Sequence, residues 1–127
     1  MNPQVPSVLL ELAGLLQRNA MPGVPPAERA SDLGLSALLL SVLAETWDRQ
    51  AHILVEENCA IRALLGETGA DADFHLSALQ AENNRLRAGL IDLQARAETA
   101  GDAALQDRIW AELVATTERR RVSTAPV

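Results

Sequence analysis

Two stretches of the sequence carry apolar residues at alternating steps of three and four, with one asparagine inside each run. The stretches are 35–65 and 72–97. At about 100° per residue, such positions share one narrow face of an α-helix, so each stretch predicts a long amphipathic helix. We call this face the Leu/Asn seam and define it by these residues: Leu40, Leu43, Trp47, Leu54, Asn58, Ile61, Leu65, Leu79, Asn83, Leu86 and Leu90.

A local pattern in the first stretch recurs 25 residues later in the second. The pattern Leu-x-x-Glu-Asn-x-x-Ile-Arg-Ala-x-Leu of 54–65 corresponds to Leu-x-x-Glu-Asn-x-x-Leu-Arg-Ala-x-Leu of 79–90. Leucine, glutamate, arginine and alanine are all strong helix formers, so shared composition explains the similarity as well as duplication does. Both explanations stay open.

The rest of the chain predicts shorter helices and an all-α domain. Apolar residues make up 48% of the sequence but aromatic residues only 2%, which favours helix over strand. We expect four helices, over these ranges: 8–20, 26 or 32 to 65, 71 or 73 to 99, and 102–121. The predicted fold is an antiparallel bundle of about four helices with two long central ones. It forms one domain over 7–121, between flexible tails of 1–6 and 122–127.

Two residues are well suited to cap the shorter helices. Ser7 and Asp102 each precede an apolar helical run, and their side chains can accept a backbone N–H bond. The last helix carries a short apolar stripe that we expect to be buried: Leu105, Ile109, Trp110, Leu113 and Val114.

The two long helices are expected to form an antiparallel hairpin around a glycine-containing loop near Thr68. In that arrangement Leu54 faces Asn83 and Asn58 faces Leu79, so the two asparagines lie within reach of each other. The shorter helices cannot cover both long ones. We therefore predict that the remaining apolar surface pairs two copies of the chain into a homodimer through the Leu/Asn seam.

Composition excludes several classes of function. The net charge is −6, whereas nucleic acids and anionic membranes recruit basic surfaces. All 11 basic residues are arginine, so there is no lysine for a Schiff base or a phosphate-binding loop. The single cysteine and the absence of a signal-like or membrane-spanning segment predict a cytoplasmic protein. No cofactor is predicted.

Asp48, His52 and Glu56 follow one another at steps of four and form a weak candidate for a metal site. This stripe points away from the Leu/Asn seam. The simpler interpretation is a solvated surface with the i,i+4 pairs Glu45–Arg49 and His52–Glu56. Asp71–His75 is expected to form a similar pair at the start of a helix.

Other candidate groups have structural explanations. Cys59 lies about 10 Å from His52 along the helix, too far for nucleophile activation, and we expect a semi-buried structural thiol. The run 119–121 contains three arginines, which suit a solvated helix C-terminus or an acidic partner. A small ligand could bind between helices near these residues: Glu57, Asn58, Asn83 and Arg87.

The sequence Leu86-Arg87-Ala88-Gly89, followed by an amphipathic C-terminal helix, resembles a family of small helical bacterial proteins of unknown function. The loop at Pro22-Gly23 before a long helix is similar too, and the resemblance covers half of the chain. Members tend to be encoded beside acyl-CoA dehydrogenase and aminoglycoside-phosphotransferase-like genes. The Asn-Pro pair expected after the last helix is absent, because residues 119–123 stand there instead. The resemblance implies an accessory role and brings no catalytic residue.

These observations predict a non-enzymatic helical-bundle protein that self-associates and serves as an accessory or interaction module. An unknown protein partner is compatible with that function. The alternative is a bundle that binds a small ligand or a metal.

Overall fold

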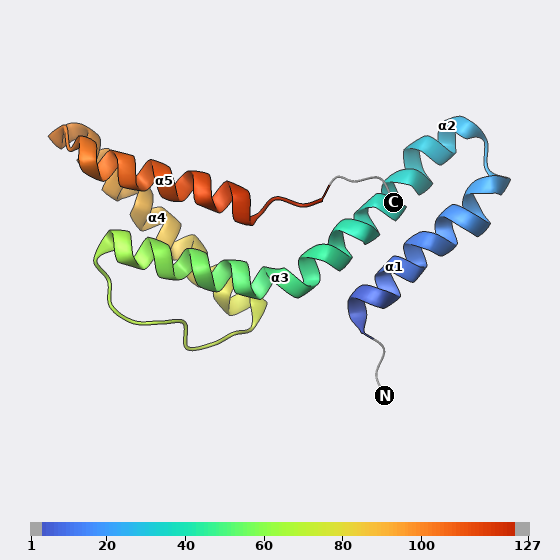
Figure 1. Ribbon diagram of the computed structural model, residues 1–127, viewed down its shortest axis with the longest axis horizontal. Helices are drawn as coiled ribbons and strands as arrows, with labels where there is room; N and C mark the ends of the chain where they lie inside the picture. The colour runs from blue at the N-terminus through green and yellow to red at the C-terminus, as the bar shows by residue number, and fades with distance from the viewer. Residues whose placement is uncertain (1–3, 124–127) are drawn as a thin grey trace. The chain divides into compact units, whose positions relative to one another are not determined.

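The structure is a computed structural model that describes residues 4–123, and all the regular secondary structure within that range is helical (Figure 1). The predicted all-α class is confirmed. The α-helices are α1 (Val5–Leu15), α2 (Pro26–Glu28), α3 (Gly34–Leu65), α4 (Leu76–Ala100) and α5 (Ala103–Arg119). Wider π-helical turns, Leu16–Ala20 and Arg29–Leu33, extend α1 and connect α2 to α3.

The described residues divide into two compact units, whereas we predicted one domain over 7–121. Unit 1 contains 4–49 with 122–123, and unit 2 contains 50–121. Helix α3 contributes residues to both units. Of the predicted tails, 1–3 and 124–127 lie outside the described residues.

In unit 1 the first helix begins earlier than the sequence predicted, and the second begins at the earlier of its two predicted starts. Helix α1 begins at Val5 with Pro6 in its first turn, where the missing N–H of proline has no helical partner to lose. Ser7 is therefore inside the helix, and the prediction that it caps the helix is wrong. The second helical segment begins at Pro26, and the π-helical turn precedes Gly34 directly, as the earlier of the two predicted starts required.

Unit 1 buries small side chains and exposes large ones. Its described buried apolar residues are Ala13, Ala37 and Ala44, each no more than 5% exposed. Ten large apolar side chains of the same unit are between 39% and 58% exposed: Val5, Val8, Leu10, Leu12, Leu15, Leu35, Leu38, Leu39, Leu43 and Trp47. We call these ten residues the unit 1 apolar face. Alanine lets helices approach closely, whereas the large apolar side chains remain about half exposed.

In unit 2 the second half of α3 and helix α4 run in the same direction, so the predicted antiparallel hairpin is wrong. Asn58 is hydrogen-bonded to Asn83, and further along both helices a Cβ built on Gly89 would lie 3.2 Å from Leu65. When residues later in one helix contact residues later in the other, the two helices must be parallel. Figure 1 shows the loop after α3 returning along that helix before α4 begins.

The loop between the two helices is long enough for this return. It contains the ten residues 66–75, because α4 begins at Leu76 and not near 71 or 73. The 25-residue offset places Leu76 level with Ala51, about 21 Å back along α3 from Leu65. Ten extended residues can span about 33 Å, so the crossover is feasible.

The third helix of unit 2, α5, follows α4 after a tight turn and runs antiparallel to it. Gly101 adopts a left-handed conformation with φ of 66°, and the side chain of Asp102 accepts a hydrogen bond from the Leu105 N–H. The predicted cap is thus confirmed. Trp110 and Val114 were expected inside, but they are 68% and 47% exposed.

The apolar core of unit 2 lies where the three helices meet. It is formed by Ile61, Leu86, Leu90 and Ile109, with partly buried leucines around them. Seven members of the Leu/Asn seam are buried inside the single chain: Leu54, Asn58, Ile61, Leu79, Asn83, Leu86 and Leu90. Of the others, Leu40 and Leu65 are half-buried, and Leu43 and Trp47 are exposed.

Candidate functional site

The carboxylate of Glu57 is the centre of a buried polar network in unit 2. Arg120, at the end of α5, donates from Nε to Oε1 at 2.7 Å and from Nη2 to Oε2 at 2.6 Å. Asn83 of α4 donates from Nδ2 to Oε2 at 3.2 Å. Glu57 has no exposed surface. Its bidentate pairing with the Arg120 guanidinium therefore compensates a wholly buried charge.

Two asparagines extend the network between the parallel helices. Asn83 donates from Nδ2 to Oδ1 of Asn58 at 3.0 Å, and both side chains are fully buried. Asn58 in turn donates to Oδ1 of Asp71 at 3.1 Å and to the backbone oxygen of Leu79 at 3.4 Å. An asparagine pair between parallel helices fixes their register, because a shift would leave buried amides unpaired.

A second ion cluster fixes the crossover loop to both helices. Arg62 of α3 donates to Asp71 at 2.6 Å and to Glu82 at 2.8 Å. Arg85 continues the cluster from Glu82 to Glu67 in the loop. Hydrogen bonds from Arg85 and then from Arg62 lower the pKa of Glu82 from 4.5 to about 2. The loop is thus attached at two carboxylates, one of them buried beneath it.

This arrangement is suited to holding structure. Among the described residues, no buried side-chain nitrogen or oxygen lacks a hydrogen-bond partner. Both oxygens of the Glu57 carboxylate accept hydrogen bonds from Arg120, and the amides of Asn58 and Asn83 are hydrogen-bonded within the network. Buried polar networks stabilise a unique arrangement when every member is satisfied, which is the condition met here.

The structure brings together the four residues proposed for ligand binding. Asn83 donates hydrogen bonds to both Glu57 and Asn58, and Arg87 lies 3.8 Å from Glu57. Sequence reasoning missed Arg120, which we had placed only at a helix end with its neighbours. Its partner is 63 residues away in the chain, and helical periodicity carries no information about such a distance.

Arg120 is therefore paired with a buried carboxylate, although its own side chain is 38% exposed, and its neighbours are paired as well. Arg119 binds Glu112 at 2.6 Å and approaches Glu56 at 3.7 Å. Arg121 lies 3.6 Å from Glu118 on the exposed surface.

Two smaller predictions about polar residues are wrong. Asp71 does not pair with His75, because its side chain points inward to Asn58 and Arg62. His75 instead contacts Asp73, whose carboxylate also accepts the His75 backbone N–H. Cys59, expected to be semi-buried, is exposed.

The acidic stripe on α3 forms the two predicted surface pairs. Arg49 lies 2.8 Å from Glu45, and His52 lies 3.4 Å from Glu56 with 74% of its side chain exposed. Within residues 4–123, no group of three or more histidine, cysteine, aspartate or glutamate side chains is arranged to hold a metal ion. That finding does not support Asp48, His52 and Glu56 as metal ligands.

The depressed pKa of Glu82 predicts a loss of stability in acid. Its folded value of about 2 lies below the ordinary 4.5, so its contribution is present above about pH 4.5 and disappears as the pH falls towards 2. We expect the free energy of unfolding of the wild type to fall over this range, and that of Glu82→Gln to fall less. Urea titrations followed by circular dichroism at several pH values measure both slopes. Equal slopes would show that Glu82 does not contribute.

No described helix combines the length and the apolar character needed to cross a membrane. Searches for similar proteins found no matching family model, no matching curated protein and no matching solved structure.

Proposed function

We propose that this chain is a cytoplasmic, non-enzymatic interaction protein whose unit 1 apolar face pairs with a second copy. The observation that carries the proposal is the inverted burial of unit 1, with alanines inside and leucines outside. An apolar surface of this kind on a helical unit usually marks an interface. The accessory role agrees with the one implied by the family resemblance.

Area and charge favour a second copy as the occupant. Ten large apolar side chains, each exposed by about half, together expose an area on the order of the 800 Å² that each partner buries in a standard interface, although Leu10 lies on the opposite side of α1 from Val8 and Leu12. The stretch 33–44 contains no charged residue, so two copies can meet there without burying a charge. A two-fold interface needs a self-complementary surface, and an uncharged leucine face meets that requirement.

The proposed interface differs from the Leu/Asn seam that the sequence suggested. Most residues of the Leu/Asn seam are buried where α3, α4 and α5 of one chain pack together. Of the seam residues, only Leu43 and Trp47 belong to the unit 1 apolar face.

Introducing charge into this face tests the proposal. We expect the wild type to be a dimer at micromolar concentration and the double variant Leu39→Glu/Leu43→Glu to be a monomer. Each buried carboxylate costs several kcal/mol, so the dissociation constant should rise at least about 100-fold. Analytical ultracentrifugation over a concentration series measures it.

Phe74→Glu is the matched control, because Phe74 is 65% exposed but lies in unit 2. It should leave the dimer intact. A wild type that is monomeric at micromolar concentration, or a control that dissociates like the double variant, would contradict the proposal.

A further inference from the structure

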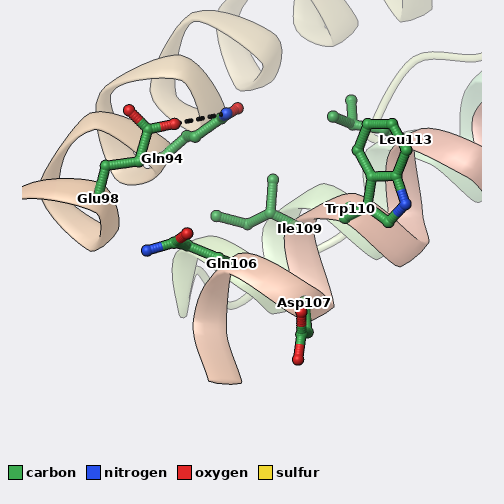
Figure 2. A pocket seen from close by; sticks show the side chains of 7 residues that line it. All are labelled: Gln94, Glu98, Gln106, Asp107, Ile109, Trp110 and Leu113. Carbon is green, nitrogen blue, oxygen red and sulfur yellow. Dashed lines mark hydrogen bonds between the residues drawn. The ribbon is translucent and has the colours of Figure 1, made fainter. Parts of the chain in front are cut away.

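A groove between α4 and α5 differs from the unit 1 apolar face, because its lining is both apolar and acidic. It has a volume of about 230 Å³ and is lined by Gln94, Glu98, Gln106, Asp107, Ile109, Trp110 and Leu113 (Figure 2). Three of these side chains are apolar, and the others are two amides and two carboxylates. The lining contains no cation.

The large apolar side chains next to this groove are unusually exposed. Trp110 is 68% exposed, and Val114, one turn further along α5, is 47% exposed. On α4, Ile91 lies one turn before Gln94 and is 69% exposed. Because α4 and α5 run in opposite directions, Ile91 and Val114 both extend the groove away from the turn at Gly101. The apolar part therefore lies at one end of the groove.

The opposite end is electrostatically negative. Glu98 is in the last turn of α4, where the helix dipole disfavours a carboxylate, and that turn contains no basic residue. Gln94 donates a hydrogen bond to Glu98 at 3.0 Å, and Asp107 lines the groove from α5. The face of the Trp110 indole also attracts cations. The positive N-terminal end of α5 at Ala103 opposes the dipole of α4, but the lining itself contributes two carboxylates and no cation.

We infer that this groove binds a short basic peptide segment of a partner protein, with an apolar side chain against Ile91, Trp110 and Val114 and an arginine or lysine near Glu98 and Asp107. Glu98 lies seven positions after Ile91, and Val114 lies seven positions after Asp107, so the two ends of the groove are about 10 Å apart along the helices. An extended peptide spans that distance in three residues. The groove is small enough for single side chains, and the net charge of −6 attracts a basic partner.

The inference does not depend on dimerisation, because every residue of the groove belongs to unit 2. The test uses the full chain and the peptide acetyl-Leu-Ala-Ala-Arg-amide, with citrulline in place of arginine as the neutral isostere. The chain contains only two tryptophans, so the two indole N–H signals in a ¹⁵N–¹H spectrum report on Trp110 and on Trp47 as an internal control.

We expect the arginine peptide to shift the Trp110 signal saturably, and the citrulline peptide to bind at least threefold more weakly. Glu98→Gln should weaken the arginine peptide at least threefold and leave the citrulline peptide unchanged, with helix content by circular dichroism unaltered. Equal affinity for the two peptides would overturn the inference. So would an unmoved Trp110 signal at about 10 mM peptide, the weak end of specific binding. Dissociation of the dimer by Trp110→Ala would also overturn it, because the groove would then bind a second copy of the chain.

Discussion

Arg120→Ala will lower the free energy of unfolding of the chain by about 2–4 kcal/mol, because it removes the arginine partner, itself 38% exposed, from the wholly buried carboxylate of Glu57. Arg120 supplies both of the short charge-assisted bonds to Glu57, at 2.7 and 2.6 Å. Without it, a carboxylate with no exposed surface keeps one hydrogen bond, from Asn83 at 3.2 Å, and the less direct charges of Arg87 at 3.8 Å and of Arg119. Urea denaturation followed by circular dichroism, at fixed protein concentration, measures the difference.

The neighbouring arginine provides the matched control. The side chain of Arg121 is 77% exposed and lies 3.6 Å from Glu118, so Arg121→Ala should change the free energy of unfolding by less than about 1 kcal/mol. The two variants remove the same type of residue, one position apart. If both cost the same small amount, the pairing of Arg120 with Glu57 does not hold the three helices together.

A double-mutant cycle separates this pairing from the packing of the arginine stem. In a Glu57→Gln background there is no buried charge to leave uncompensated, so Arg120→Ala should cost at least about 1–2 kcal/mol less than it does in the wild type. Additive effects of the two substitutions would show that Arg120 acts through its hydrocarbon contacts instead.

Sequence periodicity predicts which segments of this chain are helical, because spacing of apolar residues is a local property. It identified α3, α4 and α5 and the turn at Gly101 and Asp102. It also identified Asn58 and Asn83 as partners across a leucine surface, and they are hydrogen-bonded. The direction of pairing depends on how far the loop can travel, which the spacing of apolar residues does not encode.

Two signals for the parallel arrangement were nevertheless present in the sequence. Parallel helices bring residues with a constant offset side by side, and the repeated pattern has such an offset of 25 residues. Asn58 and Asn83 occupy equivalent positions in it. In addition, the loop from Gly66 to His75 is longer than the two to five residues that usually join antiparallel helices.

The burial of unit 1 could not be predicted from periodicity, because its helices are apolar on several sides. Where leucines surround a helix, the buried face is chosen by which side lets another backbone approach. Here the alanines at 13, 37 and 44 are buried. That choice leaves the unit 1 apolar face exposed.

Shortening the crossover loop will destabilise unit 2 by about 3 kcal/mol or more, because it breaks a buried ion pair. Deleting 66–70 leaves five residues between α3 and α4, which reach at most about 18 Å when fully extended. The return path along α3 is about 21 Å before the sideways step between helices is added. The shortened chain must therefore release Asp71 from Arg62 or unwind the start of α4.

Lengthening the same loop provides the control. Inserting four Gly/Ser residues after Gly69 adds only loop-closure entropy and should cost less than about 1 kcal/mol. In an antiparallel hairpin the deletion would cost less stability than the insertion. A five-residue connection is ideal there, and the natural loop is already too long. Urea denaturation of both variants beside the wild type therefore decides the direction of α4. A deletion variant as stable as the wild type would contradict the parallel arrangement, and with it the register that the asparagine pair imposes on Glu57 and Arg120.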